Sequence, residues 1–237
     1  MVTFKYLISV FVLFWVKVGS NGFIVDPIVD PVLQTNASTS FSIYCGKVRG
    51  LYSADSDAFM FRGIPYASPP VGDLRWRPPV DVKSTNNNCW SGEFNATVFG
   101  NHCVQSVFRN KTQIVTDSED CLYINVWTPT LNETAKLPVM YWIHGGSLTT
   151  GNGTDEENGY APTAKLAKAH NVVYVSVNYR LNAFGFLALE QLKAVSPTNT
   201  TGNYGFMDLL SGLRWVQNNI EHFGGDRNQV LPFNSVL

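Results

Sequence analysis

Residues 137–151 read LPVMYWIHGGSLTTG, an apolar run that stops at a histidine followed by two glycines. The run Val139–Ile143 is short and bounded by turn residues, which is typical of a strand buried on both faces of a parallel sheet. Gly145 and Gly146 allow positive φ and a close approach of the backbone to a ligand. Backbone N–H groups presented there can stabilise a developing negative charge, although an ordinary strand-to-loop turn shows the same residues.

The segments that follow this run predict a β-α-β unit with parallel strands. Pro162–His170 has the pattern of a short helix, and Val172–Tyr179 is a second apolar, β-branched run. A strand, a loop, a helix and a strand in this order are typical of an α/β fold. Apolar residues then recur at helical spacing over Tyr204–Phe223, and Gly224 provides a stop signal for that helix.

The segments that precede the run predict antiparallel strands and a rigid connection. The expected strands are Phe41–Leu51, Ala58–Arg62 and Cys121–Trp127. Phe61–Pro79 is dense in proline and glycine but carries large aromatic residues, so we expect an irregular segment held in place by its aromatic side chains. Its prolines fix φ and cannot donate to a sheet, which favours a structural role.

Composition limits the classes of function. A length of 237 residues is enough for one domain with a sizeable core. A net charge of −1 without a basic run gives no reason to expect nucleic acid or an anionic membrane as a partner. After the N-terminal residues, no apolar stretch reaches the ~20 residues that a membrane span requires.

Residues 1–20 have the pattern of a secretory signal peptide, with Lys5 before the apolar run Tyr6–Val16 and small residues after it. The predicted mature domain is therefore residues 21–237, in the secretory pathway, either secreted or in the endoplasmic reticulum lumen. Six glycosylation sequons agree with export. They lie at Asn36, Asn95, Asn110, Asn132, Asn152 and Asn199. Four cysteines in an oxidising compartment suggest disulfides, and the residues alone leave three pairings open.

Five motifs together resemble the N-terminal part of the type-B carboxylesterase family, which includes the cholinesterases. They are FRGIPYASPPVGDLRWRPP (61–79), SEDCLYINVWTP (118–129), LPVMYWIHGGS (137–147), VNYRLNAFGFLAL (177–189) and GNYGFMDLLSGLRWVQNNIEHFGGD (202–226). The resemblance implies the N-terminal half of an α/β-hydrolase, with an antiparallel β-entry followed by a parallel β-α-β sheet. It also implies serine-dependent cleavage of small-molecule carboxylic esters, with no cofactor and no metal.

The same resemblance places the family's oxyanion loop at Gly145, Gly146 and Ser147. The N–H groups of Gly146 and Ser147 would be its donors. Ser147 stands where the family has a third glycine, and a positive φ at a serine costs on the order of 1 kcal/mol. His144 is expected to be structural rather than a base.

Further residues take their roles from the resemblance. Cys103 and Cys121 match a family disulfide around a surface loop, which leaves Cys45 and Cys89 to pair or stay free. The family's buried ion pairs correspond to Arg75 with Glu119 and to Arg180 with Asp208. Residues 104–120 contain no tryptophan, where the family's cholinesterases carry one that binds choline, so a choline substrate is disfavoured. Asn182 replaces a frequent family glycine, a change that asparagine tolerates in the left-handed region.

The nucleophile motif of the family, G-x-S-x-G, does not occur in this sequence. Counting along the family pattern places the nucleophile at Val236, and Ser235 has no flanking glycines. None of the four histidines matches the family's base. We therefore expect a truncated, catalytically inactive chain. A non-catalytic, secreted cholinesterase-like binding or adhesion module is the alternative.

One edge of the central strand is expected to lack a partner strand. In the implied topology, Val139–Ile143 lies between Val172–Tyr179 and the nucleophile strand. Leu231–Leu237 contains Pro232, which cannot donate to a central ladder. The sequence thus predicts that one edge of the central strand stays unpaired. We expect the chain to be retained in the secretory pathway and to aggregate or be degraded rather than to be secreted efficiently.

Overall fold

The computed structural model describes residues 16–19, 22–25, 33–34, 39–82, 90–109, 112–154, 161–194, 196 and 199–234. Two compact units divide between Leu33 and Gln34. The first unit contains the antiparallel pair β1 (Val16–Gly19) and β2 (Gly22–Val25), so part of the predicted signal peptide is a strand here. Among the described residues, no helix combines the length and the apolar character that a membrane crossing requires.

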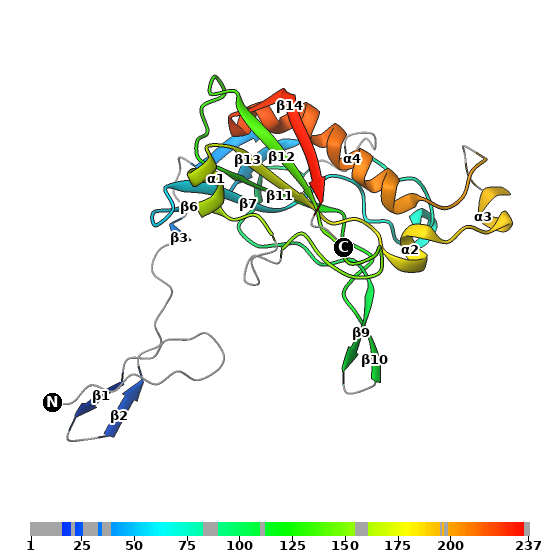
Figure 1. The fold of residues 1–237 in the computed structure, drawn as a ribbon, viewed down its shortest axis with the longest axis horizontal. Helices are drawn as coiled ribbons and strands as arrows, with labels where there is room; N and C mark the ends of the chain where they lie inside the picture. The colour runs from blue at the N-terminus through cyan, green and yellow to red at the C-terminus, as the bar shows by residue number, and fades with distance from the viewer. Residues whose placement is uncertain are drawn as a thin grey trace. The chain divides into compact units, whose positions relative to one another are not determined.

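The second unit is built on one mixed sheet of the strand order β14-β12-β13-β11-β7-β6-β3. Its strands within this unit are β6 (Leu51–Ser53), β7 (Ala58–Pro65), β11 (Tyr123–Thr128), β12 (Leu137–Ile143), β13 (Val173–Val177) and β14 (Gly225–Asn234), while the two residues of β3 (Leu33–Gln34) lie on either side of the division between the units. Strand β12 runs parallel to both β13 and β14, whereas β11 is antiparallel to β13 and to β7. The expected antiparallel entry and parallel β-α-β unit are confirmed (Figure 1).

Two smaller sheets accompany the central one. One has the order β4-β5-β8 and the other is the hairpin of β9 and β10. Their strands are β4 (Ser40–Ile43), β5 (Gly46–Arg49), β8 (Glu93–Asn95), β9 (Gln105–Arg109) and β10 (Thr112–Thr116). The helices are α1 (Ala164–His170), α2 (Asn182–Phe186), α3 (Glu190–Ala194) and α4 (Tyr204–Asn219), with 3₁₀ turns η2 (Gly72–Leu74) and η3 (Ile220–Phe223).

The ends of the helices follow the local sequence signals. Thr163 caps α1 by accepting a hydrogen bond from Leu166 N, and the left-handed Asn171 ends that helix. The predicted helix 204–223 is α4 followed by η3, after which Gly224 takes a φ of 77°. The predicted irregular segment 61–79 is partly wrong, since its first five residues complete β7.

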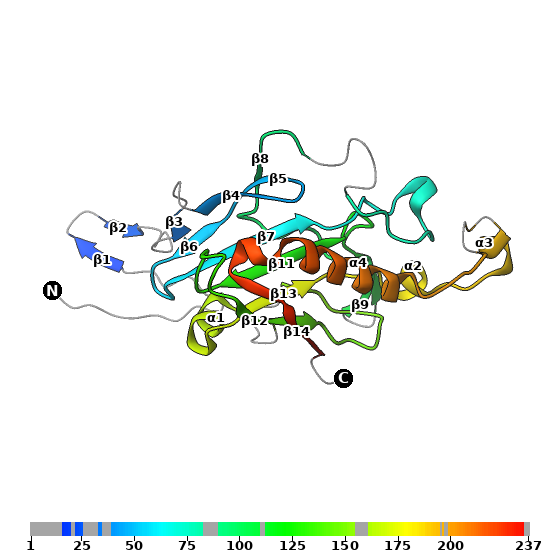
Figure 2. The same cartoon turned by 90° about the horizontal axis from the view of Figure 1, so that it is seen from above.

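Helices cover both faces of the central sheet (Figures 1 and 2). Side chains alternate along a strand, so Val173, Val175 and Val177 pack with α4 while Tyr174 packs with α1. Helix α4 approaches β12 closely at Gly212, where a Cβ atom would lie 2.4 Å from Tyr141 Oη. The Tyr141 hydroxyl donates to Leu209 O at 3.0 Å, which fixes the helix along the strand.

The expectation of an unpaired β12 edge is wrong. Strand β14 pairs in parallel with β12, and Pro232 lies opposite Tyr141. Among the described strands, β14 is the outermost on this side of the sheet. Proline is tolerated in an outer strand, because a missing N–H on the outward side removes no ladder hydrogen bond. Leu231 on β14 is 58% exposed, so the outer strand still carries an exposed apolar side chain.

One buried ion pair joins the end of β13 to α4. Arg180 Nε and Nη2 donate to Asp208 at 2.8 and 2.7 Å, and the Arg180 backbone N–H donates to the same carboxylate at 3.0 Å. The side chains are 3% and 0% exposed. Arg75 also pairs with Glu119, but these side chains are 40% and 20% exposed, so the expectation that this pair is buried is wrong.

We predict that Asp208→Asn destabilises the chain by about 3–5 kcal/mol, because it leaves the Arg180 guanidinium buried without a counter-charge. Unfolding in urea measures this loss. Glu119→Gln is the matched control and should cost much less, since solvent screens the half-exposed Arg75. An equal loss in the two variants would contradict the role assigned to the buried pair.

Candidate active site

The carboxyl end of β12 opens into a cavity of about 560 Å³. The lining comprises Ile143, His144, Gly145, Ser147, Leu148, Tyr179, Phe206, Leu209, Pro232, Phe233 and Asn234. These residues come from the ends of the parallel strands β12 and β14, from the loop after β13 and from α4. A crevice at the carboxyl ends of parallel strands is the usual place for a ligand in an open α/β sheet.

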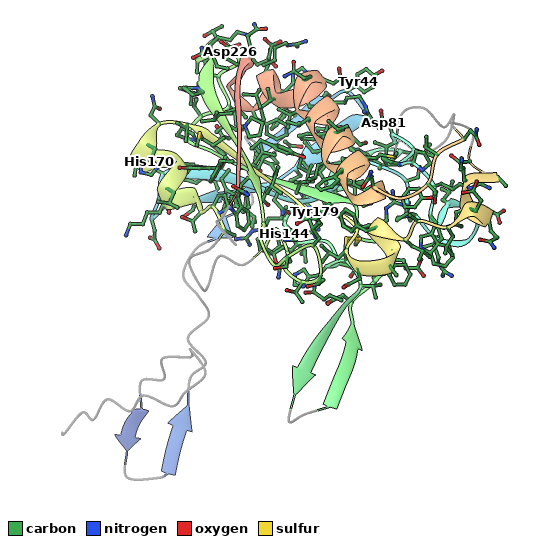
Figure 3. All side chains as sticks on the ribbon, turned by 45° about the vertical axis from the view of Figure 1, so that its right-hand side comes forward. Tyr44, Asp81, His144, His170, Tyr179 and Asp226 are labelled. Carbon is green, nitrogen blue, oxygen red and sulfur yellow. A yellow bond between two sulfur atoms is a disulfide. The ribbon has the colours of Figure 1, made fainter. Side chains whose placement is uncertain are left out.

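His144 is buried at the carboxyl end of β12. Its ring stacks on Tyr179 with the centroids 4.4 Å apart, and the Tyr179 hydroxyl donates to His144 O at 3.0 Å (Figure 3). Nδ1 lies 2.9 Å from Gly145 O, so Nδ1 carries the proton of the neutral ring. Burial lowers the pKa of His144 to about 4, and the ring is neutral at physiological pH.

The loop after β12, residues 144–151, contains the expected oxyanion segment and is compact and strained. Ser147 has a φ of 53° and Leu148 a φ of 61°, both in the left-handed region. Each such residue costs on the order of 1 kcal/mol or more and persists where its surroundings fix it. Inside the loop, Gly146 O accepts from the amides of Thr149 and Thr150 at 2.9 and 3.1 Å. Among the described residues, the N–H groups of Gly146 and Ser147 have no hydrogen-bond acceptor.

A buried polar network holds the segment after the loop. Gly153 N donates to Asn178 Oδ1 at 2.7 Å, and Gly153 O accepts from Asn125 Nδ2 and Ser176 Oγ at 3.3 and 2.6 Å. Our sequence reasoning did not identify these positions. The signal was present, because Asn125 and Ser176 are polar residues inside otherwise apolar strand segments and a buried polar group needs partners.

The structure places the other predicted residues around this site. Cys103 and Cys121 are joined with an Sγ–Sγ distance of 1.99 Å, in the segment next to the loop. Asn182 has a φ of 53°, as its left-handed preference predicted. Cys89 lies outside the described residues, so the pairing of Cys45 with Cys89 is not described.

The six sequons differ in their surroundings. Asn95, Asn132 and Asn199 are exposed, and Asn152 is half-buried beside the loop. Asn36 and Asn110 lie outside the described residues.

The end of β14 reaches the cavity where the resemblance expects the nucleophile. Asn234 is the last described residue, and it lines the cavity together with Phe233. Ser235 and Val236 lie outside the described residues. Within the described residues, no group of histidine, cysteine, aspartate or glutamate side chains is arranged to hold a metal ion.

We predict that His144 makes stability depend on pH. Its folded-state pKa of about 4 lies below the ordinary value of 6.5, so the unfolded chain binds a proton first as the pH falls. Its contribution is complete above pH 6.5 and is lost towards pH 4, a loss of about 3 kcal/mol.

Urea unfolding between pH 4 and 7 should show this loss in the parent chain and a flatter profile in His144→Gln. His222→Gln, at the surface, is the matched control. An unchanged slope in His144→Gln would contradict the prediction.

Comparisons with known proteins agree with this geometry. The Carboxylesterase family model matches residues 37–234. Fumonisin B1 esterase of Sphingopyxis macrogoltabida is 41% identical over 189 residues, which cover 79% of this chain and 33% of that protein. Carboxylesterase 3B of Mus musculus is 36% identical over 232 residues, which cover 94% of this chain and 38% of that protein.

A similar solved structure is the carboxylesterase EST55 of Geobacillus stearothermophilus at pH 6.8. It is 36% identical with a TM-score of 0.68, over 83% of this chain and 38% of that one. The chain spans between 33% and 38% of the length of these three relatives. Both the sequence and the fold thus show that this chain belongs to the carboxylesterase family and corresponds to the N-terminal part of its α/β-hydrolase domain.

Proposed function

We propose that this chain forms the oxyanion-loop side of a carboxylesterase active site, and that the substrates are small-molecule carboxylic esters. The observation that carries the proposal is the Gly145–Ser147 segment, of which Gly145 and Ser147 line the cavity of about 560 Å³. Within the described part of the chain, the N–H groups of Gly146 and Ser147 make no hydrogen bond. Two such donors suit the oxygen of an ester carbonyl as it gains negative charge.

The lining of the cavity supports an uncharged ester. No lysine, arginine, aspartate or glutamate lines it among the described residues, and His144 is neutral at physiological pH. Phe206, Leu209 and Phe233 supply apolar surface for an acyl or alcohol group. Burying a charged ligand group against such a lining would carry an uncompensated desolvation cost.

We further propose that this chain alone binds esters without hydrolysing them. Its sequence contains no G-x-S-x-G, and the position that matches the family nucleophile is Val236. Without a nucleophile and its base, most of the rate enhancement of such an enzyme is absent. The two proteins named above as esterases are about three times as long as the part that this chain matches.

We propose a secretory-pathway location, supported by the signal-peptide pattern of residues 1–20 and by the sequons. Exposed asparagines at positions 95, 132 and 199 are accessible in the folded chain. Expression through a secretory pathway should therefore yield a glycoprotein, and digestion with peptide-N-glycosidase should increase its electrophoretic mobility. An unchanged mobility would contradict the proposed location.

We predict that the chain binds phenyl butyrate in saturation-transfer NMR, while phenol release stays at the level of a protein-free control. Gly146→Ala should weaken binding by about tenfold or more, the loss expected from one hydrogen bond to the carbonyl oxygen. The added Cβ would lie 2.1 Å from Thr150 O, so the loop must shift.

Gly92→Ala is the matched control for backbone strain. Gly92 also has a positive φ of 75°, but a Cβ there meets nothing within 4 Å. Equal binding by Gly146→Ala and the parent chain would contradict the proposed site. Phenol release above the control would contradict the proposed lack of turnover.

A further inference from the structure

The Gln105 side chain holds the far end of the loop after β12, at Gly151. Gly151 N donates to Gln105 Oε1 at 2.9 Å, and Gln105 Nε2 donates to Gly151 O at 3.1 Å. This is the two-bond pattern by which opposite residues of an antiparallel ladder pair, here made by a side-chain amide. Gln105 is 7% exposed, so the pair is shielded from competing water.

Gly151 in turn packs against the start of the loop. Its φ is +109°, and a Cβ atom there would lie 2.5 Å from both Gly145 O and His144 Nδ1. The two ends of the loop are therefore in contact. A displacement of Gly151 would disturb its packing against Gly145 O and the His144 ring.

Gln105 also makes a hydrogen bond outside the loop. Its Nε2 also donates to Cys103 O at 3.2 Å, so both amide hydrogens are used. Cys103 is bonded to Cys121 with their Cα atoms 4.9 Å apart, just before β11. The connection thus runs from the disulfide through Gln105 to Gly151.

We propose that Gln105 is a positioning residue that couples the Cys103–Cys121 disulfide to the oxyanion loop. Two consecutive left-handed residues, Ser147 and Leu148, need constraints from outside the loop. Asn182 supplies one, with its N–H donating to Leu148 O at 2.9 Å and its Nδ2 to Thr149 O at 2.7 Å. The Gln105 amide supplies another at Gly151. The use of the loop in ester binding rests on the function proposed above. The coupling between the disulfide and the loop affects the loop geometry whether or not the loop binds an ester.

The first experiment measures hydrogen exchange in the 237-residue chain by NMR. The probes are the amides of Thr149 and Thr150, which donate to Gly146 O and make no bond to Gln105. Gln105→Met should accelerate their exchange by about tenfold or more. Gln217→Met is the matched control, because Gln217 also donates to a backbone oxygen, that of Arg227, but lies on the surface of α4. Unchanged exchange at both probes in Gln105→Met would overturn the proposal.

A second variant gives a readout that simple packing would not produce. In Gln105→Glu, a protonated carboxyl can accept from Gly151 N and donate to Gly151 O, whereas a carboxylate faces that oxygen without a hydrogen. Burial raises the pKa of such a group, so protection of the Thr149 and Thr150 amides should be lost at about pH 8 and regained at about pH 5. The protection factor of each amide is its intrinsic exchange rate divided by its measured rate. Equal protection factors at the two pH values would overturn the proposal.

Reduction of the disulfide completes the test. It should accelerate exchange at Thr149 and Thr150 in the parent chain but add little in Gln105→Met, because coupled changes are not additive. Amides of β13 serve as the reference for intact folding. Equal acceleration in both chains would overturn the coupling. A protected loop that fails to bind phenyl butyrate would contradict the proposed function alone.

Discussion

The parallel pairing of β12 on both of its edges is the constraint on which this structure depends. A strand bonded to β13 on one side and to β14 on the other has no freedom of register. Its carboxyl end therefore delivers His144 and the glycines that follow to a fixed place. Helix α4 supports the same strand through Gly212 and Tyr141, and the Arg180–Asp208 pair fixes α4 to the end of β13.

The loop after β12 shows how a strained segment is maintained. Ser147 and Leu148 adopt backbone angles that an isolated chain would avoid, and the constraint comes from outside the loop. His144 stacks on Tyr179 at one end, and Gln105 binds Gly151 at the other. Pre-organised N–H donors need little reorganisation free energy when negative charge develops on a ligand, because the folded chain has already aligned them. The strain at Ser147 is thus compatible with the chemistry of the family.

The apolar character of the cavity and the neutral state of His144 have the same physical origin. Both follow from the apolar side chains of α4 and β14 that line the cavity with the end of β12, and from the burial of the histidine ring. A charged histidine there would lack a counter-charge among the lining residues. The site is therefore suited to neutral ligands with one polar atom at the loop.

The sequence by itself determined the local elements and the family. Apolar periodicity located β12, β13 and α4. Glycines marked the end of β12 and the end of the helix that starts with α4, and five motifs identified the carboxylesterase resemblance. Those features depend on residues that are close together in the chain, where side-chain period and turn chemistry are sufficient. The sequence alone also placed Val236 at the position that matches the family nucleophile.

Only the tertiary structure decided which distant groups meet. Pro232 suggested that β14 would not pair with β12, yet proline is tolerated in an outer strand and the pairing forms. Arg75 and Glu119 were correctly paired, but their exposure depends on what covers them, which no local pattern reveals. Gln105 carried no signal at all. Its role arises because the disulfide and the chain fold bring its amide to Gly151, 46 residues away, and such long-range hydrogen bonds are set by packing rather than by local sequence.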